Sequence, residues 1–102
     1  MKQRINLFNR YLFDDLKIKK LRKKCGLEAY ALYCYLMEII NNSKTELLLD
    51  EETKECICCN IFICTDSFDT MLDEMFVLDI FDKEYFEKTR LLYNVYAHKK
   101  GE

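Results

Sequence analysis

The chain has 102 residues, a length that suffices for one domain. Half of the residues are hydrophobic and 14% are aromatic, so the chain is too apolar for a disordered segment. It has no proline and only two glycines, so helices with short connections are favoured over strands joined by tight turns. The net charge of −2 conceals a division: residues 1–25 carry nine basic and two acidic side chains, whereas residues 26–102 carry seven basic and sixteen acidic ones.

No apolar run reaches the ~18 residues of a membrane helix, and none follows the basic residues near the N-terminus as in a secretion signal. We therefore expect a cytoplasmic protein without membrane contact. Its six cysteines are then expected to stay reduced rather than to pair as disulfides.

Residues 1–12 have no clear period and are predicted to be an N-terminal arm, followed by a single domain at residues 13–99. Asp14 or Asp15 can cap the first helix, because a short carboxylate accepts a free N–H of the first turn. This helix is predicted to run to Cys25. Its buried stripe is predicted to be Ile18, Leu21 and Cys25.

Gly26 separates that helix from a second one, Leu27–Asn42. Residues 29–37 are apolar on all faces, which is typical of a helix surrounded by others and predicts the centre of the core. The tyrosines of this segment cannot all face inward. A tyrosine of this segment that lies at the surface is more typical of a protein interface than of a platform for base stacking.

Residues 46–49 are a candidate strand, and Asp50 opens a third helix with acidic residues in its first turn. The stretch 61–63 has strand propensity, but a helix end followed by a turn is favoured. Thr65 or Asp66 is predicted to cap a fourth helix. Its buried stripe is predicted to be Phe68, Met71, Leu72, Met75 and Phe76.

Val77–Phe81 and Tyr85–Thr89 are predicted to be two strands of a hairpin, and a last helix is predicted to begin at Thr89. Its inward residues would be Leu91, Leu92, Val95 and Tyr96. The expected fold is mainly α (α+β), with the order α-α-β-α-α-β-β-α. A helix-turn-helix followed by a hairpin, the wing, is the winged-helix arrangement.

The first two helices also carry a resemblance. Asp15-Leu16-Lys17-Ile18-Lys19-Lys20-Leu21 fits the pattern D-x-K-I-x-x-L, and it is followed by Gly26, an aromatic-rich helix and Glu38 near the end of that helix. This combination resembles the N-terminal winged-helix domain of the DnaD-like and phage replisome-organiser (Lin-type phage) proteins, over about residues 11–96. The resemblance implies DNA binding, self-association or both during replication initiation.

The basic run of the first helix is the candidate DNA-binding site. Several cations on one helix face would contact phosphates and give salt-dependent affinity without base specificity. A solubilising exposed face is the alternative. The predicted phosphate contacts are Lys17, Lys19, Lys20, Arg22, Lys23 and Lys24.

The fourth helix would be the recognition helix of a winged helix, yet its outward residues are acidic. Carboxylates in a groove lined by phosphates are repelled, so base reading by this helix is not expected. The wing carries the cations Lys83, Lys88 and Arg90, which are too few to bind DNA alone and are otherwise ordinary surface residues.

The spacing of Cys56, Cys58, Cys59 and Cys64 could suggest zinc, but buried thiols in place of alanine are favoured because one helix face cannot gather these four residues. The single histidine, His98, is remote from them and is expected to be solvated. We therefore expect no metal, cofactor, small-molecule substrate or catalytic residue.

Two functional hypotheses remain. One is a non-catalytic winged-helix domain of a DNA replication initiation protein that contacts DNA through its first helix. The other is a degenerate winged helix for binding replication proteins or for self-association, for example as a homodimer.

Overall fold

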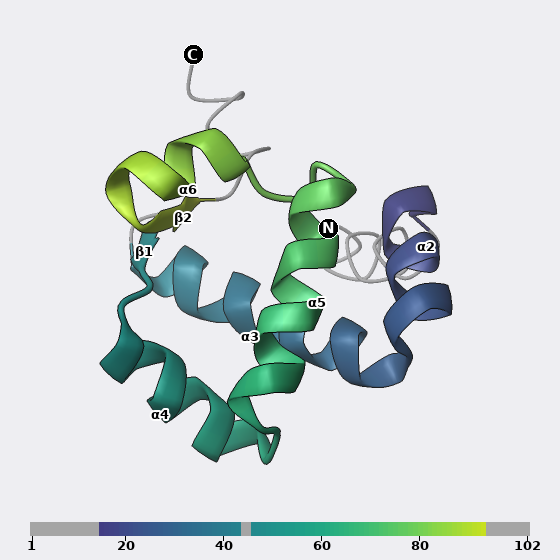
Figure 1. Ribbon diagram of the computed structural model, residues 1–102, viewed down its shortest axis with the longest axis horizontal. Helices are drawn as coiled ribbons and strands as arrows, with labels where there is room; N and C mark the ends of the chain where they lie inside the picture. Colours follow the sequence, from purple (N-terminus) through teal and green to yellow (C-terminus); the bar gives the residue numbers. More distant parts are fainter. Residues whose placement is uncertain (1–14, 44–45, 94–102) are drawn as a thin grey trace, which may run out of the picture.

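The computed structural model describes residues 15–43 and 46–93, which form five helices and a two-stranded antiparallel sheet (Figure 1). In chain order the elements are α2 (Leu16–Cys25), α3 (Leu27–Asn42), β1 (Glu46–Leu48), α4 (Glu51–Ile61), α5 (Thr65–Val77), α6 (Lys83–Thr89) and β2 (Leu91–Tyr93). The predicted mainly helical α+β class is confirmed. None of these helices is long and apolar enough to cross a membrane.

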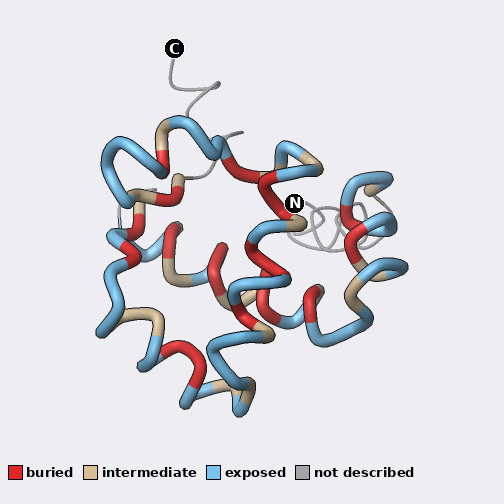
Figure 2. The backbone as a smooth tube through the Cα atoms, in the orientation of Figure 1, coloured by how far each residue is buried: buried red, intermediate tan, exposed pale blue. Residues whose placement is uncertain are grey.

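The core is built around α3 and α5, where buried positions gather in the middle of the molecule (Figure 2). All five residues of the predicted α5 stripe are buried, and Phe68 is fully enclosed. Six residues of α3 are buried as well, which confirms its central position. Truncating an enclosed aromatic residue such as Phe68 to alanine is expected to destabilise the fold by about 3–5 kcal/mol.

The first helix begins and ends as predicted. Of the two candidate caps, Asp15 lies at the start of α2, where its carboxylate accepts hydrogen bonds from the backbone N–H groups of Lys17 (3.0 Å) and Ile18 (3.3 Å). Gly26 follows α2 with φ of 86°, a conformation that favours glycine. Ile18 and Leu21 are buried, whereas Cys25 is half-buried.

The turn between α4 and α5 also follows the prediction in outline. Helix α4 ends at Ile61, and Phe62 adopts the left-handed conformation that ends many helices, which confirms the helix end and turn. The residue that precedes α5 is Cys64, so the predicted cap at Thr65 or Asp66 is wrong by one or two positions.

The predicted hairpin is wrong. Val77 is the last residue of α5, and Asp82 caps helix α6 by accepting a hydrogen bond from the Tyr85 N–H at 3.2 Å. Strand β2 then occupies the start of the predicted last helix. The cause is local: an aspartate cap and the good helix formers of KEYFEKT outweigh the β propensity of two aromatic residues.

Strand β2 pairs with β1 in the register Glu46 with Tyr93, Leu47 with Leu92 and Leu48 with Leu91. Leu92 is buried in this pairing. Up to α5 the described elements follow one another as predicted, but α6 and β2 then stand in place of the predicted hairpin and the start of the last helix, so the predicted order as a whole is not confirmed. The predicted arm at residues 1–12 and the inward positions Val95 and Tyr96 lie outside the described residues.

Candidate nucleic-acid interface

Helix α2 packs on α3 and α5 through Ile18 and Leu21, which turns its basic residues toward the outside. Its six cations do not form one uniform face. Three lie along the edges, next to α3 or α5, and three lie opposite the buried stripe. The two sets have different surroundings and therefore different capacity to contact a ligand.

The edge cations already have contacts within the protein. The Lys17 ammonium donates a hydrogen bond to the Asp79 carbonyl oxygen at 3.3 Å. The Lys24 ammonium lies 3.9 Å from the Glu74 carboxylate.

On the other edge, the Arg22 guanidinium lies 5.8 Å from the centroid of the Tyr30 ring, and Arg22 is half-buried. These contacts tie the edges of α2 to the helices beneath it.

The remaining three, Lys19, Lys20 and Lys23, form what we call the outer lysine face. All three are exposed, and their spacing of i, i+1 and i+4 places them on one side of the helix. None of them forms an ion pair with another side chain in residues 15–43 or 46–93. As far as the described residues show, these three are the predicted α2 contacts whose ammonium groups are not engaged by another side chain and can meet a phosphate.

Helix α5 presents acid, as predicted. Asp66, Asp69 and Asp73 are exposed, while Glu74 is half-buried against α2. Asp69 accepts a hydrogen bond from the Lys54 ammonium of α4 at 3.1 Å, and this bond is the main reason that the pKa of Lys54 is raised. Entry of this helix into a DNA groove is unfavourable, because the phosphates repel its carboxylates.

The three predicted wing cations do not lie on a wing. Lys83 and Lys88 belong to α6, where the Lys83 ammonium lies 4.0 Å from the Glu87 carboxylate. Arg90 follows that helix with its guanidinium 4.4 Å above the Phe86 ring. Because α6 and α2 lie on opposite sides of α5, these cations do not extend the outer lysine face (Figure 1).

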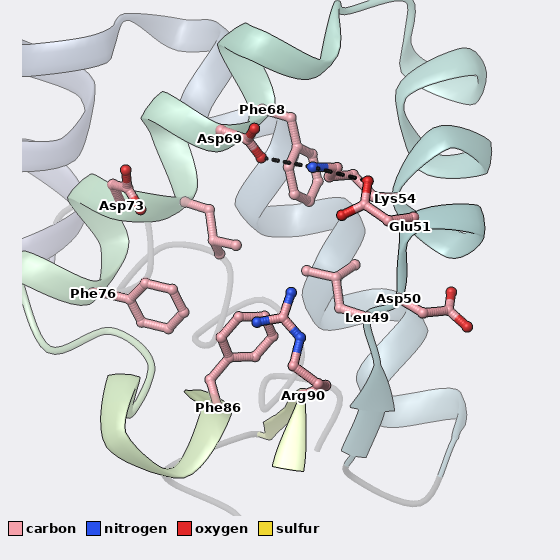
Figure 3. Close-up of a pocket in the computed structure, with 11 residues that line it drawn as sticks. Leu49, Asp50, Glu51, Lys54, Phe68, Asp69, Asp73, Phe76, Phe86 and Arg90 are labelled. Atoms are coloured by element: carbon pink, nitrogen blue, oxygen red, sulfur yellow. Dashed lines mark hydrogen bonds and ion pairs between the residues drawn. The ribbon is translucent and has the colours of Figure 1, made fainter. Parts of the chain in front are cut away.

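Sequence reasoning missed a hollow of about 270 Å³ between α4, α5 and α6 (Figure 3). Its lining combines apolar residues with charged ones: Leu49, Asp50, Glu51, Lys54, Phe68, Asp69, Leu72, Asp73, Phe76, Phe86 and Arg90. If residues 83–89 had been predicted to form a helix, Phe86 could have been expected to face α5, and this would have indicated the apolar lining of the hollow.

The cysteines are placed differently from the prediction. Only Cys58 of the four is buried, and burial raises its pKa, while Cys56, Cys59 and Cys64 are exposed. The idea that these four replace buried alanines is therefore wrong for three of them. Among the residues with described positions, no group of three or more His, Cys, Asp or Glu is arranged to hold a metal ion. His98 lies outside that part of the chain.

The tyrosines of α3 follow the expectation that they cannot all be enclosed. Tyr33 is buried, whereas Tyr30 and Tyr35 are half-buried. The Tyr35 hydroxyl accepts a hydrogen bond from the Asn60 side-chain amide at 2.9 Å, so it joins α3 to α4.

Comparison with known proteins adds one finding. Residues 8–95 match the phage-related family described as Lin1244/Lin1753-like, N-terminal, which covers most of the chain. No curated protein and no solved structure matches the chain.

Proposed function

The chain belongs to the Lin1244/Lin1753-like N-terminal family, and from this premise we propose that it is a non-catalytic domain of a phage-type or bacterial DNA replication initiation protein. Its proposed task is to contact DNA non-specifically through the outer lysine face of α2. This proposal accounts for a concentration of cations that solubility alone does not require.

The proposed fold is a winged helix without its hairpin. The succession α3, β1, α4, α5 and β2 supports this assignment, with β1 and β2 paired and α4 joined to α5 by the short turn 62–64. Helix α6 occupies the position in the chain where the wing would stand. Helices α4 and α5 then correspond to the helix-turn-helix, with an acidic second helix.

The observation that carries the proposal is the exposure of Lys19, Lys20 and Lys23 on one helix face. Cations there neutralise phosphates and release counterions, which favours binding entropically and without regard to base sequence. Three phosphate contacts predict that the logarithm of the binding constant falls with the logarithm of salt concentration with a slope of about −3.

The test is binding to random-sequence duplex and single-stranded DNA across a salt series. The variant Lys20→Glu with Lys23→Glu should weaken binding by at least about tenfold, since each reversal replaces attraction by repulsion. Lys83→Glu with Lys88→Glu changes the net charge equally on α6 and is the matched control. Equal losses in both variants, or no binding of the parent protein at low salt, would rule the proposal out.

A second candidate is a module for protein interaction or self-association. It is favoured by the exposed acid of α5 beside the basic α2, since unlike charges on different faces permit association between copies. Sedimentation at several protein concentrations and two salt concentrations tests it. Association that salt abolishes supports this candidate, and a monomer at every concentration counts against it.

A further inference from the structure

The hollow between α4, α5 and α6 has an apolar floor that is already assembled. Phe68, Leu72 and Phe76 of α5 meet Leu49 and Phe86, and all five residues are at most 8% exposed. The rings of Phe76 and Phe86 lie 5.3 Å apart between centroids at an angle of 36°. Such a floor can receive an apolar or aromatic-stacking group without repacking of the core.

The mouth of the hollow is acidic. Asp69 and Asp73 stand one helical turn apart on α5, and both are exposed. The Lys54 side chain is only 16% exposed, and its ammonium pairs with Asp69 and with Glu51. Asp73 forms no ion pair within the described part of the chain, so its carboxylate is available to an incoming cation.

Asp50 is occupied in another way. Its carboxylate accepts a hydrogen bond from the Thr53 N–H at 2.8 Å, at the start of α4, and it points away from the hollow (Figure 3). Glu51 and Asp69 pair with Lys54, so the lining carboxylate that stays without an ion pair among the described residues and faces a ligand is Asp73 of α5.

Arg90 shows which chemical group suits this floor. Its guanidinium lies 4.4 Å above the Phe86 ring and points into the hollow (Figure 3). Its backbone is fixed on both sides, because the N–H donates to the Phe86 carbonyl at 2.6 Å and the carbonyl accepts from the Leu49 N–H at 2.9 Å. The protein thus already stacks one planar cation here, while the carboxylate of Asp73 has no ion-pair partner among residues 15–43 and 46–93.

From this arrangement we infer that the hollow binds an arginine side chain presented by a basic segment of a partner protein. The stem of that side chain would lie on Leu72 and Phe76, and its guanidinium would reach the carboxylate of Asp73. Arginine suits the site better than lysine because its planar group stacks on aromatic rings and pairs with carboxylates in two parallel hydrogen bonds. Nucleic acid is disfavoured, because the lining has four acidic side chains and two basic ones, an excess of negative charge that repels phosphate.

The inference does not depend on DNA binding by α2, and its test uses a separate probe. Methyl NMR spectra of leucine-labelled protein are recorded during titration with N-acetyl-arginine amide and with N-acetyl-citrulline amide, its neutral isostere. The arginine probe should shift the methyl signals of Leu49 and Leu72, and the citrulline probe should shift them several times less. Equal shifts by both probes would refute the inference.

Variants locate the binding. Asp73→Asn should weaken binding of the arginine probe by about 1.5- to fivefold, the range expected for one exposed ion pair. Asp66→Asn removes the same charge from the same helix outside the hollow and should leave the affinity unchanged. Arg90→Asn should raise the affinity about two- to threefold, because it removes a competing cation while asparagine tolerates the left-handed backbone.

Two further results would overturn the assignment: an equal loss in the Asp66 and Asp73 variants, or a short DNA duplex that shifts the methyl signals of Leu49 and Leu72. The variant Lys20→Glu with Lys23→Glu should bind the arginine probe like the parent protein. The success or failure of this site is therefore distinguishable from that of the α2 surface.

Discussion

The Lys24 ammonium of α2 lies 3.9 Å from the Glu74 carboxylate of α5, so the basic and the acidic helix meet at this pair. The lysine side chain is 68% exposed and the glutamate side chain 19%, which leaves the cation hydrated and the carboxylate largely covered. A pair of this kind contributes at most about 1 kcal/mol to stability. Its larger consequence is electrostatic, because it places a negative charge beside the surface proposed to bind phosphate.

Replacing Glu74 by glutamine should strengthen DNA binding about twofold at low salt, because it removes a repulsive carboxylate and frees Lys24. The gain should disappear at high salt, where such interactions are screened. Binding isotherms at several salt concentrations measure both effects. Asp66→Asn, which removes a charge near the other end of α5, should give a smaller gain. Weaker binding by the Glu74 variant would place the DNA contact away from this edge of α2.

The helices could be predicted wherever a local signal sufficed. The apolar period of α5 and the carboxylate at the start of α2 are such signals, and Phe68 and Asp15 lie as they indicate. Helix α6 has a local signal as well, the Asp82 cap, but the aromatic residues Tyr85 and Phe86 favoured a strand, and contacts from outside the segment add to the packing of the helix. The Tyr85 hydroxyl donates a hydrogen bond to the Glu46 carboxylate at 3.0 Å, and the Tyr85 ring packs edge-on against Tyr93 at 5.0 Å. Glu46 is 39 positions away in the chain, so no short window of sequence around residue 85 contains that partner.

The candidate site was predicted in composition and not in detail. A run of six cations predicts a basic helix. The sequence does not show that Lys17 contacts the backbone carbonyl of Asp79, or that Lys24 contacts the carboxylate of Glu74. The cysteines show a related difficulty. Neighbouring positions on α4 can face opposite ways, so Cys58 is buried whereas Cys59 is exposed.

Asp50 should make stability depend on pH. The hydrogen bond from the Thr53 N–H lowers the pKa of the Asp50 carboxyl below its ordinary value of 3.8. A lowered pKa in the folded state means that the stabilisation is complete above the ordinary pKa and is lost as pH falls through the lowered one. Asp50→Ala should therefore destabilise the protein near neutral pH, and the difference from the parent should shrink in acid.

Asp50→Asn is the control for that variant, since asparagine caps helices without titrating. Urea unfolding at neutral and acidic pH compares the three proteins. The asparagine variant should retain most of the stability near neutral pH. A loss as large as that of the alanine variant would show that charge, rather than the capping hydrogen bond, is what α4 requires.

Cys64 should be the most reactive thiol of the described chain. Hydrogen bonding with Ser67 lowers the pKa of Cys64, which is exposed at the start of α5, whereas burial raises the pKa of Cys58. Since the thiolate is the nucleophile, iodoacetamide should label Cys64 faster than the exposed Cys56 and Cys59 near neutral pH. The advantage should narrow as pH rises toward the ordinary thiol pKa of 9.0.

Timed labelling followed by peptide mass spectrometry measures these rates within one molecule, so Cys56 and Cys59 serve as internal references. Ser67→Ala removes the hydroxyl that lies 3.3 Å from the Cys64 sulfur and should slow its labelling selectively. Equal rates at the three exposed thiols would show that the contact with Ser67 does not activate Cys64.

Phe62 is a site where substitution should stabilise the protein. The residue is 90% exposed, so removing the ring sacrifices little buried surface, and its φ of 59° is a left-handed conformation that a Cβ atom disfavours. Phe62→Gly should raise the free energy of unfolding by about 0.5–1 kcal/mol, since relief at the end of α4 outweighs the extra freedom of glycine in the unfolded chain. Phe62→Ala removes the same ring but keeps the Cβ, and it should give no such gain in urea unfolding. An equal gain in both variants would assign the effect to the exposed ring and not to the backbone of the turn.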